Sequence, residues 1–235
     1  MSGWKAKRFW NSATAEPCEG GFTVRLDGRL VKTPAKAAFV LPTLAMAQAA
    51  AREWDAQHGL VNPDTMPVTR AANSAIDKLS VQFDEVVALL AAYGETDLLC
   101  YRATGPEALV ARQAAAWDPL LTWAAQDLGA ALVATAGVMH VAQPPQSLAR
   151  LHALTAAFDK FRLAAFHDLV AISGSLVLGF AVVRGRISAA ESFDISRIDE
   201  TWQAEIWGVD ETAAELEAFK RQAYLAADAF LALCG

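Results

Sequence analysis

Apolar and polar residues alternate along residues 21–26, Gly-Phe-Thr-Val-Arg-Leu, and again along residues 29–32. Such alternation places successive side chains on opposite faces of a β-strand. The Asp27-Gly28 pair between the two runs favours a type I′ turn, because both residues tolerate a positive φ. The pattern therefore predicts a β-hairpin. Two further candidate strands are residues 5–10 and 37–41.

Most of the remaining chain shows the three-to-four-residue periodicity of amphipathic helices. Pro42 and Thr43 begin an Ala-rich helix that ends near Gly59. Residues 132–141 fit either a strand or a helix, since periodicity does not decide between the two. The other predicted helices cover residues 70–92, 106–128, 145–159, 162–183, 189–207 and 211–233.

These elements predict an α+β protein in two parts. A small β-rich N-terminal domain covers residues 1–66, and a larger all-helical C-terminal domain covers residues 67–235. Ser188 and Glu191 form a capping box at the start of one helix, and Asp210 is the expected N-cap of the last helix.

The charge balance bears on the kind of partner. The chain carries 26 acidic and 20 basic residues, and residues 67–235 hold 20 of the acids but only 12 of the bases. Nucleic-acid binding relies on Lys and Arg to neutralise phosphates, so we expect no nucleic-acid partner. The excess of acidic residues in the second part either only keeps that surface solvated or creates an electrostatic field that steers a protein partner.

The cysteines and the most apolar stretch argue against a disulfide scaffold and a membrane span. Cys18, Cys100 and Cys234 are an odd number with no paired spacing, which favours reduced thiols. Leu169–Val183 has fifteen residues without a charge, fewer than the roughly 18–20 that a bilayer requires. We therefore expect a buried core helix and no membrane insertion.

Motifs for nucleotide or acyl chemistry are absent from the sequence. It contains no glycine-rich phosphate loop, no dinucleotide fingerprint and no nucleophile elbow. Ser173-Gly174-Ser175 lies inside the most apolar predicted helix, where small residues let a neighbouring backbone approach. The four histidines lack metal-ligand spacing, so we expect no cofactor and no metal.

Two weak constellations keep an enzymatic alternative open. His167 and Asp168 are adjacent, and a helix directs adjacent side chains apart. Asp199 and Glu200 are a second carboxylate-containing pair that could serve acid–base chemistry. A small hydrolase or transferase built on either pair would enclose it in a deep pocket with perturbed pKa values.

The predicted helix at residues 189–207 has two distinct faces. Ile195, Ile198, Trp202 and Ile206 share one side, which we interpret as the core seam. Trp202 is its largest member, and its replacement by Ala is expected to cost about 3–5 kcal/mol.

The opposite side of this helix carries Glu200, Gln203 and Trp207. An aromatic beside an acid and an amide, away from the buried stripe, is typical of a partner-binding surface. Alternatively, Trp207 packs against the next helix and Glu200 is merely solvated. Periodicity alone leaves both interpretations open.

The order and spacing of several segments resemble the assembly chaperones for the alpha subunit of the F-type ATP synthase catalytic sector. The resemblance extends from about Lys7 to Glu211. Its segments are residues 7–10, 20–29, 31–34, 53–54, 66–70 with Asn73, 96–102, Gln113 with 117–120, 174–175, 199–203 and 207–210.

The resemblance implies an ATP-independent, client-specific chaperone that transiently holds the unassembled alpha subunit until the beta subunit takes its place. It also implies a function for the acidic residue that matches Glu200 in the Asp-Glu-x-Trp-Gln segment. It therefore favours the partner-binding interpretation, with Asp199, Glu200, Gln203 and Trp207 as client-binding residues and no catalytic residue.

Eukaryotic members of that family begin with a long targeting region, whereas the family segments start here within ten residues of Met1. We therefore expect a cytoplasmic protein of a bacterium, with the mitochondrial matrix as the alternative if the sequence is a trimmed form. We expect the chain to act as a monomer.

Overall fold

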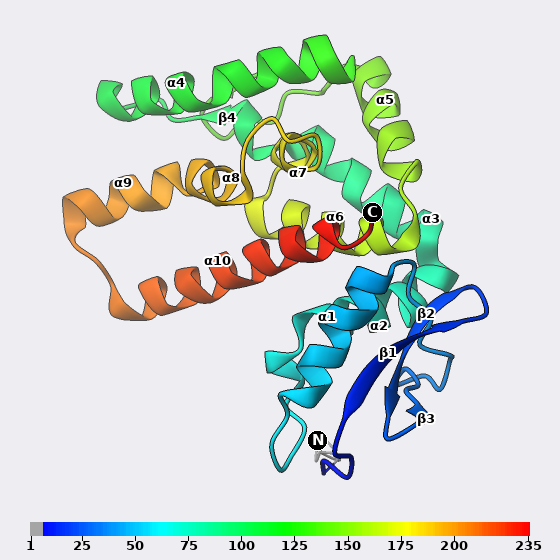
Figure 1. The fold of residues 1–235 in the computed structure, drawn as a ribbon. Helices are drawn as coiled ribbons and strands as arrows, with labels where there is room; N and C mark the ends of the chain where they lie inside the picture. Colours follow the sequence, from blue (N-terminus) through cyan, green and yellow to red (C-terminus); the bar gives the residue numbers. More distant parts are fainter. Residues whose placement is uncertain (1–6) are drawn as a thin grey trace. The chain divides into compact units, whose positions relative to one another are not determined.

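The computed structural model describes residues 7–235, and the chain divides into two compact units (Figure 1). The first takes in the chain up to Phe83 together with Asp159–Ala165 and Ala229–Gly235. The second consists of Asp84–Phe158 and Phe166–Asp228. A few strands precede a mainly helical chain, which confirms the α+β class. The expected domain boundary at residue 66 stays a prediction, since a compact unit need not fold independently.

A three-stranded antiparallel sheet opens the first unit. Its strands β1 (Ala13–Cys18), β2 (Gly21–Leu26) and β3 (Arg29–Leu30) lie in sequence order. Asp27 and Gly28 have φ values of 46° and 80°, the two positive angles that a type I′ turn requires. The predicted hairpin is confirmed.

The other strand predictions for the first unit are not confirmed over the residues that the structure describes, and residues 5 and 6 lie outside them. β1 was not predicted, because its Ala-Thr-Ala-Glu-Pro-Cys sequence lacks large apolar residues and Pro17 is tolerated only at a sheet edge. Residues 37–41 form only isolated bridges, between Ala38 and Lys32 and between Leu41 and Phe22. At residues 5–10 the described part begins at Lys7, which makes a single bridge to Leu60.

Helix α1 (Leu44–Asp55) packs against β1 and β2. Thr43 is its N-cap and accepts a hydrogen bond from the Met46 amide at 3.1 Å. The Glu53 carboxylate of α1 accepts bonds from the amides of Val68 and Thr69 at 2.7 and 2.8 Å, which caps the next helix. The remaining elements of this region are the 3₁₀ turn Pro63–Thr65, α2 (Pro67–Ser74), the π turn Ala75–Leu79 and α3 (Ser80–Ala91), which continues into the second unit.

The second unit is mainly helical. Two short parallel strands pair within it, and one of them lies in the ambiguous segment 132–141. The strands are β4 (Tyr101–Arg102) and β5 (Thr135–Ala136), and the 3₁₀ turns are Ala92–Thr96 and Leu98–Cys100. The helices are α4 (Glu107–Trp123) with the π turn Ala124–Leu128, α5 (Pro145–Ala156), α6 (Lys160–Ser173), α7 (Leu176–Val183), α8 (Ala189–Ser196), α9 (Ile198–Trp207) and α10 (Glu211–Ala232). Residues 160–165 of α6 and residues 229–232 of α10 belong to the first unit.

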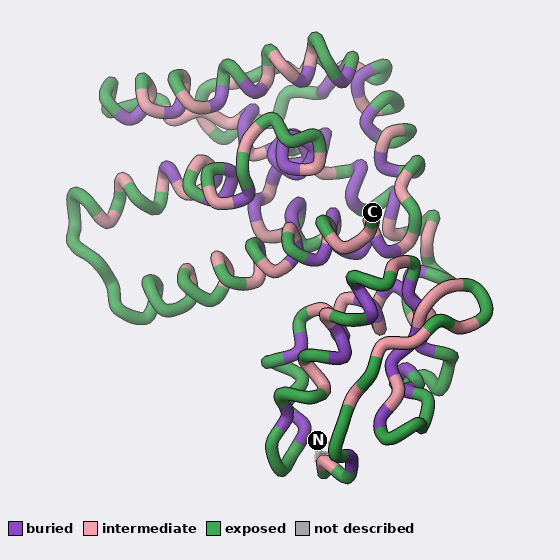
Figure 2. Tube along the Cα trace, viewed as in Figure 1, coloured by how far each residue is buried: buried purple, intermediate pink, exposed green. Residues whose placement is uncertain are grey.

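The single helix predicted over residues 162–183 is wrong. Gly174 has a φ of 73° and ends α6, and Ser175 starts α7 by accepting a bond from the Leu178 amide at 3.0 Å. Ser173-Gly174-Ser175 is therefore a corner between helices. The close approach occurs at Gly179 instead, where an added Cβ would lie 2.8 Å from Val170. Helix α7 is buried over nearly its whole length (Figure 2).

A buried carboxylate holds the start of α7. Asp97 is fully buried and accepts bonds from the Ser175 hydroxyl at 2.7 Å and from the Val177 and Leu99 amides at 3.0 Å. Burial raises the pKa of Asp97, while these hydrogen bonds act to lower it. The acid thus joins the segment at residues 96–102 to the helix corner at residue 174.

The helix predicted over residues 189–207 breaks at Arg197, whose φ and ψ are −109° and 17°. This kink rotates the faces of α8 and α9 relative to each other, so the predicted seam holds only in part. Ile198 is buried, Ile195 and Trp202 are half-buried, and Ile206 is 52% exposed.

No helix in the described part of the chain is both long and apolar enough to cross a membrane.

Candidate protein-binding surface

Helix α9 is anchored to α4 by a buried amide. Gln113 of α4 is 1% exposed and donates from Nε2 to Oδ1 of Asp199 at 2.6 Å. Its Oε1 accepts a bond from the Ala103 amide at 2.8 Å. Asp199 therefore has a structural partner and is half-buried.

Glu200 follows Asp199 but lies mainly in solvent. Its side chain is 53% exposed, and Oε1 lies 2.8 Å from Nη1 of Arg197. Arg197 is itself held by the Ile172 carbonyl, which accepts from Nη2 at 2.7 Å. The contact orients Glu200 without burying it, and the described residues supply no partner for Oε2.

Trp202 does not lie in the core as predicted, but takes part in a second contact between α4 and α9. The Arg112 guanidinium lies 4.9 Å from the centre of the Trp202 ring and makes two 2.9 Å bonds to the Glu205 carboxylate. These hydrogen bonds lower the pKa of Glu205. Trp202 thus contributes a half-buried cation–π contact and not a core anchor.

The far side of α9 from α4 is open. Gln203 is exposed, and the Trp207 side chain is 81% exposed. Gly208 ends the helix with a φ of 91°, and Asp210 caps α10 by accepting a bond from the Ala213 amide at 2.8 Å. Trp207 does not pack against α10, so the packing interpretation of this residue was wrong.

Of the four predicted site residues, Glu200, Gln203 and Trp207 share one exposed face, whereas Asp199 contacts α4. Their role in binding a client stays a prediction.

The exposed surface extends beyond the face that the sequence indicated. The chain is mainly exposed from the end of α9 into the first turns of α10 (Figure 2). Several large apolar side chains lie in this stretch. Periodicity could not reveal them, because an apolar stripe looks the same whether a neighbouring element covers it or not. The additional residues are Ile206, Val209, Leu216 and Phe219.

The enzymatic alternative depends on how the structure places the His167–Asp168 pair. His167 and Asp168 do not point apart, since Nδ1 of His167 lies 2.9 Å from Oδ1 of Asp168. Both are about half exposed. Among the described residues, no group of three or more His, Cys, Asp or Glu could hold a metal ion.

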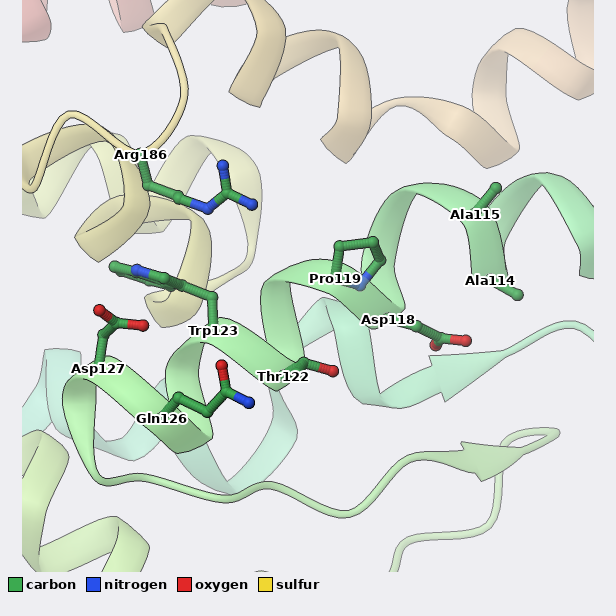
Figure 3. Close-up of a pocket in the computed structure, with 9 residues that line it drawn as sticks. All are labelled: Ala114, Ala115, Asp118, Pro119, Thr122, Trp123, Gln126, Asp127 and Arg186. Carbon is green, nitrogen blue, oxygen red and sulfur yellow. The ribbon is translucent and has the colours of Figure 1, made fainter.

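Two shallow grooves of the second unit are lined by other residues. One, of about 620 Å³, runs along α4, with Arg186 and Trp123 facing each other at one end (Figure 3). The other, of about 410 Å³, is mainly apolar and lies between α3 and α5. Neither is lined by His167, Asp168, Asp199 or Glu200.

The chain is similar to several known proteins over nearly its whole length. A family model described as ATP12 chaperone protein matches residues 7–125. The mitochondrial protein atp12 of Schizosaccharomyces pombe is 25% identical over 240 residues, which cover 97% of this chain and 82% of the relative. The crystal structure of Atp12 from Paracoccus denitrificans matches with a TM-score of 0.96 at 50% identity, covering 99% of this chain and 100% of that one. The Atu1473 protein from Agrobacterium tumefaciens matches with a TM-score of 0.93 at 41% identity, covering 97% and 86%.

Proposed function

Because the chain belongs to the ATP12 chaperone protein family, we propose that it is an ATP-independent, client-specific chaperone for assembly of the F-type ATP synthase. It binds the unassembled alpha subunit, covers the interface meant for the beta subunit, and releases the alpha subunit when the beta subunit replaces it. It acts in the bacterial cytoplasm as a monomer and catalyses no reaction.

One observation carries the choice of surface. Buried polar side chains nearby are engaged in holding the fold, as Gln113 holds Asp199 and Asp97 holds the start of α7. Glu200 makes only a largely exposed ion pair with Arg197, and no hydrogen bond of the Gln203 or Trp207 side chain is found among the described residues. The three side chains form a single exposed face on a well-anchored helix. A large aromatic that leaves 81% of its surface in water contributes little to the stability of the chain itself. Such a residue suits a surface that is covered only in a complex.

The proposed mechanism requires no chemical energy. A subunit made before its partner exposes an apolar interface, and such interfaces aggregate. A chaperone that covers part of this interface with moderate affinity prevents aggregation. The beta subunit covers the interface more completely and therefore displaces the chaperone by competition for the same surface.

The test is a charge reversal at Glu200. We expect Glu200→Lys to leave the melting temperature nearly unchanged, since the side chain is largely exposed, but to reduce suppression of alpha-subunit aggregation. Light scattering of purified alpha subunit at increasing chaperone concentration measures this loss.

Two further variants separate the site from a general charge effect. Glu85→Lys makes the same change at another exposed position, on α3, and should suppress aggregation like the unmodified chain. Glu200→Gln removes the charge without repelling Arg197 and should have an intermediate effect. Equal suppression by Glu200→Lys and the unmodified chain would refute the role of this face.

A further inference from the structure

Helix α9 and the first turns of α10 form a mainly exposed segment, residues 198–219, which we term the arm and in which Ile198 is the one buried residue. Between Glu211 and Ala223 of α10 no residue is buried, and the first buried side chain of that helix is Tyr224 (Figure 2). A helix as short as residues 211–223 has only marginal stability in water when it is isolated. Most helical stability in proteins comes from packing of an apolar face. These turns of α10 lack that packing within the second unit.

The arm nevertheless carries large apolar side chains. Single exposed apolar residues are common on protein surfaces, but a group of them within one short segment marks an interaction site. Leu216 and Phe219 are three residues apart on α10 and therefore share a face. The exposed fractions are 81% for Trp207, 70% for Val209, 65% for Phe219, 54% for Leu216 and 52% for Ile206.

The charge of the arm is of one sign. It contains seven carboxylates and no Lys or Arg. Two of the carboxylates have internal ion pairs, Glu200 with Arg197 and Glu205 with Arg112. Among the described residues, Glu211, Glu215 and Glu217 make no ion pair. The acidic residues of the arm are Asp199, Glu200, Glu205, Asp210, Glu211, Glu215 and Glu217.

We infer that the arm is a docking site for a polypeptide segment whose apolar side chains are flanked by Lys or Arg. This inference rests on the proposed function and specifies the part of the alpha subunit that is held: an apolar stretch of its interface with basic residues at the edges. The apolar side chains of the arm supply affinity by being removed from water, and the carboxylates supply orientation and association rate.

The charge also disfavours other occupants. Nucleic acid and an anionic lipid surface would both be repelled by the carboxylates of the arm, of which only Glu200 and Glu205 are paired with an Arg among the described residues. A second copy of the chain bound at the arm would bring two acidic arms together. The repulsion between their carboxylates disfavours such a dimer unless a basic surface lies between them. A basic and apolar polypeptide matches both properties of the arm at once.

The experiment compares binding of the purified alpha subunit of a bacterial F-type ATP synthase to immobilised variants. We expect the double variant Trp207→Ser, Phe219→Ser to bind at least about tenfold more weakly, chiefly through faster dissociation. The matched control is Val138→Ser, Met139→Ser, since these residues are 91% and 76% exposed outside the arm. Its affinity should equal that of the unmodified chain.

A second pair of variants tests the charge. Replacing Glu211, Glu215 and Glu217 by Gln should slow association at low salt and flatten its dependence on ionic strength. The control replaces the exposed acids Glu19, Asp84 and Glu85 by the corresponding amides, which changes the net charge equally. The control should retain the salt dependence.

The outcomes separate this inference from the proposed function. If the unmodified chain does not bind the alpha subunit, the proposed function fails and the inference falls with it. If the unmodified chain binds but the arm variants bind equally well, the inference alone is overturned. A self-associated chain that the Trp207→Ser, Phe219→Ser variant makes monomeric, with unchanged alpha-subunit binding, would also overturn it.

Discussion

Individual polar residues show how the second unit presents a largely exposed helix in a fixed position. Gln113 uses both ends of its amide, one for the backbone of Ala103 and one for Asp199. Arg197 is held by the carbonyl of Ile172 and holds Glu200 in turn. A buried amide or guanidinium is costly without partners, so these residues are confined to one geometry. The α9 face is therefore oriented before any partner arrives.

Trp117 and Trp202 illustrate what a residue pattern can and cannot predict. Both lie at apolar positions of helical periodicity, but only Trp117 is buried, at 1% exposure, with its indole N–H donating to the Ile195 carbonyl at 3.1 Å. The kink at Arg197 turns Trp202 out of the core. The sequence contains no proline or glycine at that point, so the break had no local signal.

The stability of the two tryptophan variants follows from this difference. Trp117→Ala should lower the free energy of unfolding by about 3–5 kcal/mol, since it empties a buried site and leaves a carbonyl unpaired. Trp202→Ala should cost only about 1–2 kcal/mol, because a half-buried ring loses less burial and one cation–π contact. Urea unfolding of both variants measures the difference. Equal losses would mean that Trp202 is buried as deeply as Trp117, which would contradict this difference.

At the scale of elements, periodicity predicted where helices occur but not where they bend. The helix starts after Thr43, Ser188 and Asp210 were predictable. Each of these side-chain oxygens accepts a hydrogen bond from a backbone amide in the first turn of the following helix. The corner at Gly174 was not predicted, because the charge-free run of residues 169–183 outweighed the helix-stop signal of Gly174 and the N-cap signal of Ser175. The carboxylate of Asp97, which lies 78 residues from Ser175 in the sequence, holds this corner by accepting a hydrogen bond from the Ser175 hydroxyl.

Asp97 should therefore be critical for the start of α7. Asp97→Ala leaves the Leu99 and Val177 amides and the Ser175 hydroxyl without their acceptor in a buried site, and should lower the free energy of unfolding by about 3 kcal/mol or more. Chemical denaturation followed by circular dichroism measures the loss. Asp84→Ala is the control, because Asp84 is exposed. A comparable stability for both variants would contradict this role.

For the whole molecule, the sequence predicted the fold class and the exposed face of α9 but not the full surface. The α+β class follows from local patterns of alternation and helical period, which survive in the structure. The exposure of Leu216 and Phe219 does not follow from such patterns, because they resemble a core stripe until the neighbours of α10 are known. Membership in a chaperone family and an acidic, apolar arm lead to the same expectation, a protein that binds another protein.

The proposed function requires the chain to hold a lone alpha subunit and to release it to the beta subunit. The most direct measurement is co-purification of the tagged chain with newly synthesised alpha subunit, without beta subunit and at increasing beta-subunit concentration. We predict a complex in the absence of beta subunit that disappears as beta subunit is added, with no nucleotide required. Failure to retain the alpha subunit, or a complex that the beta subunit does not displace, would contradict the account.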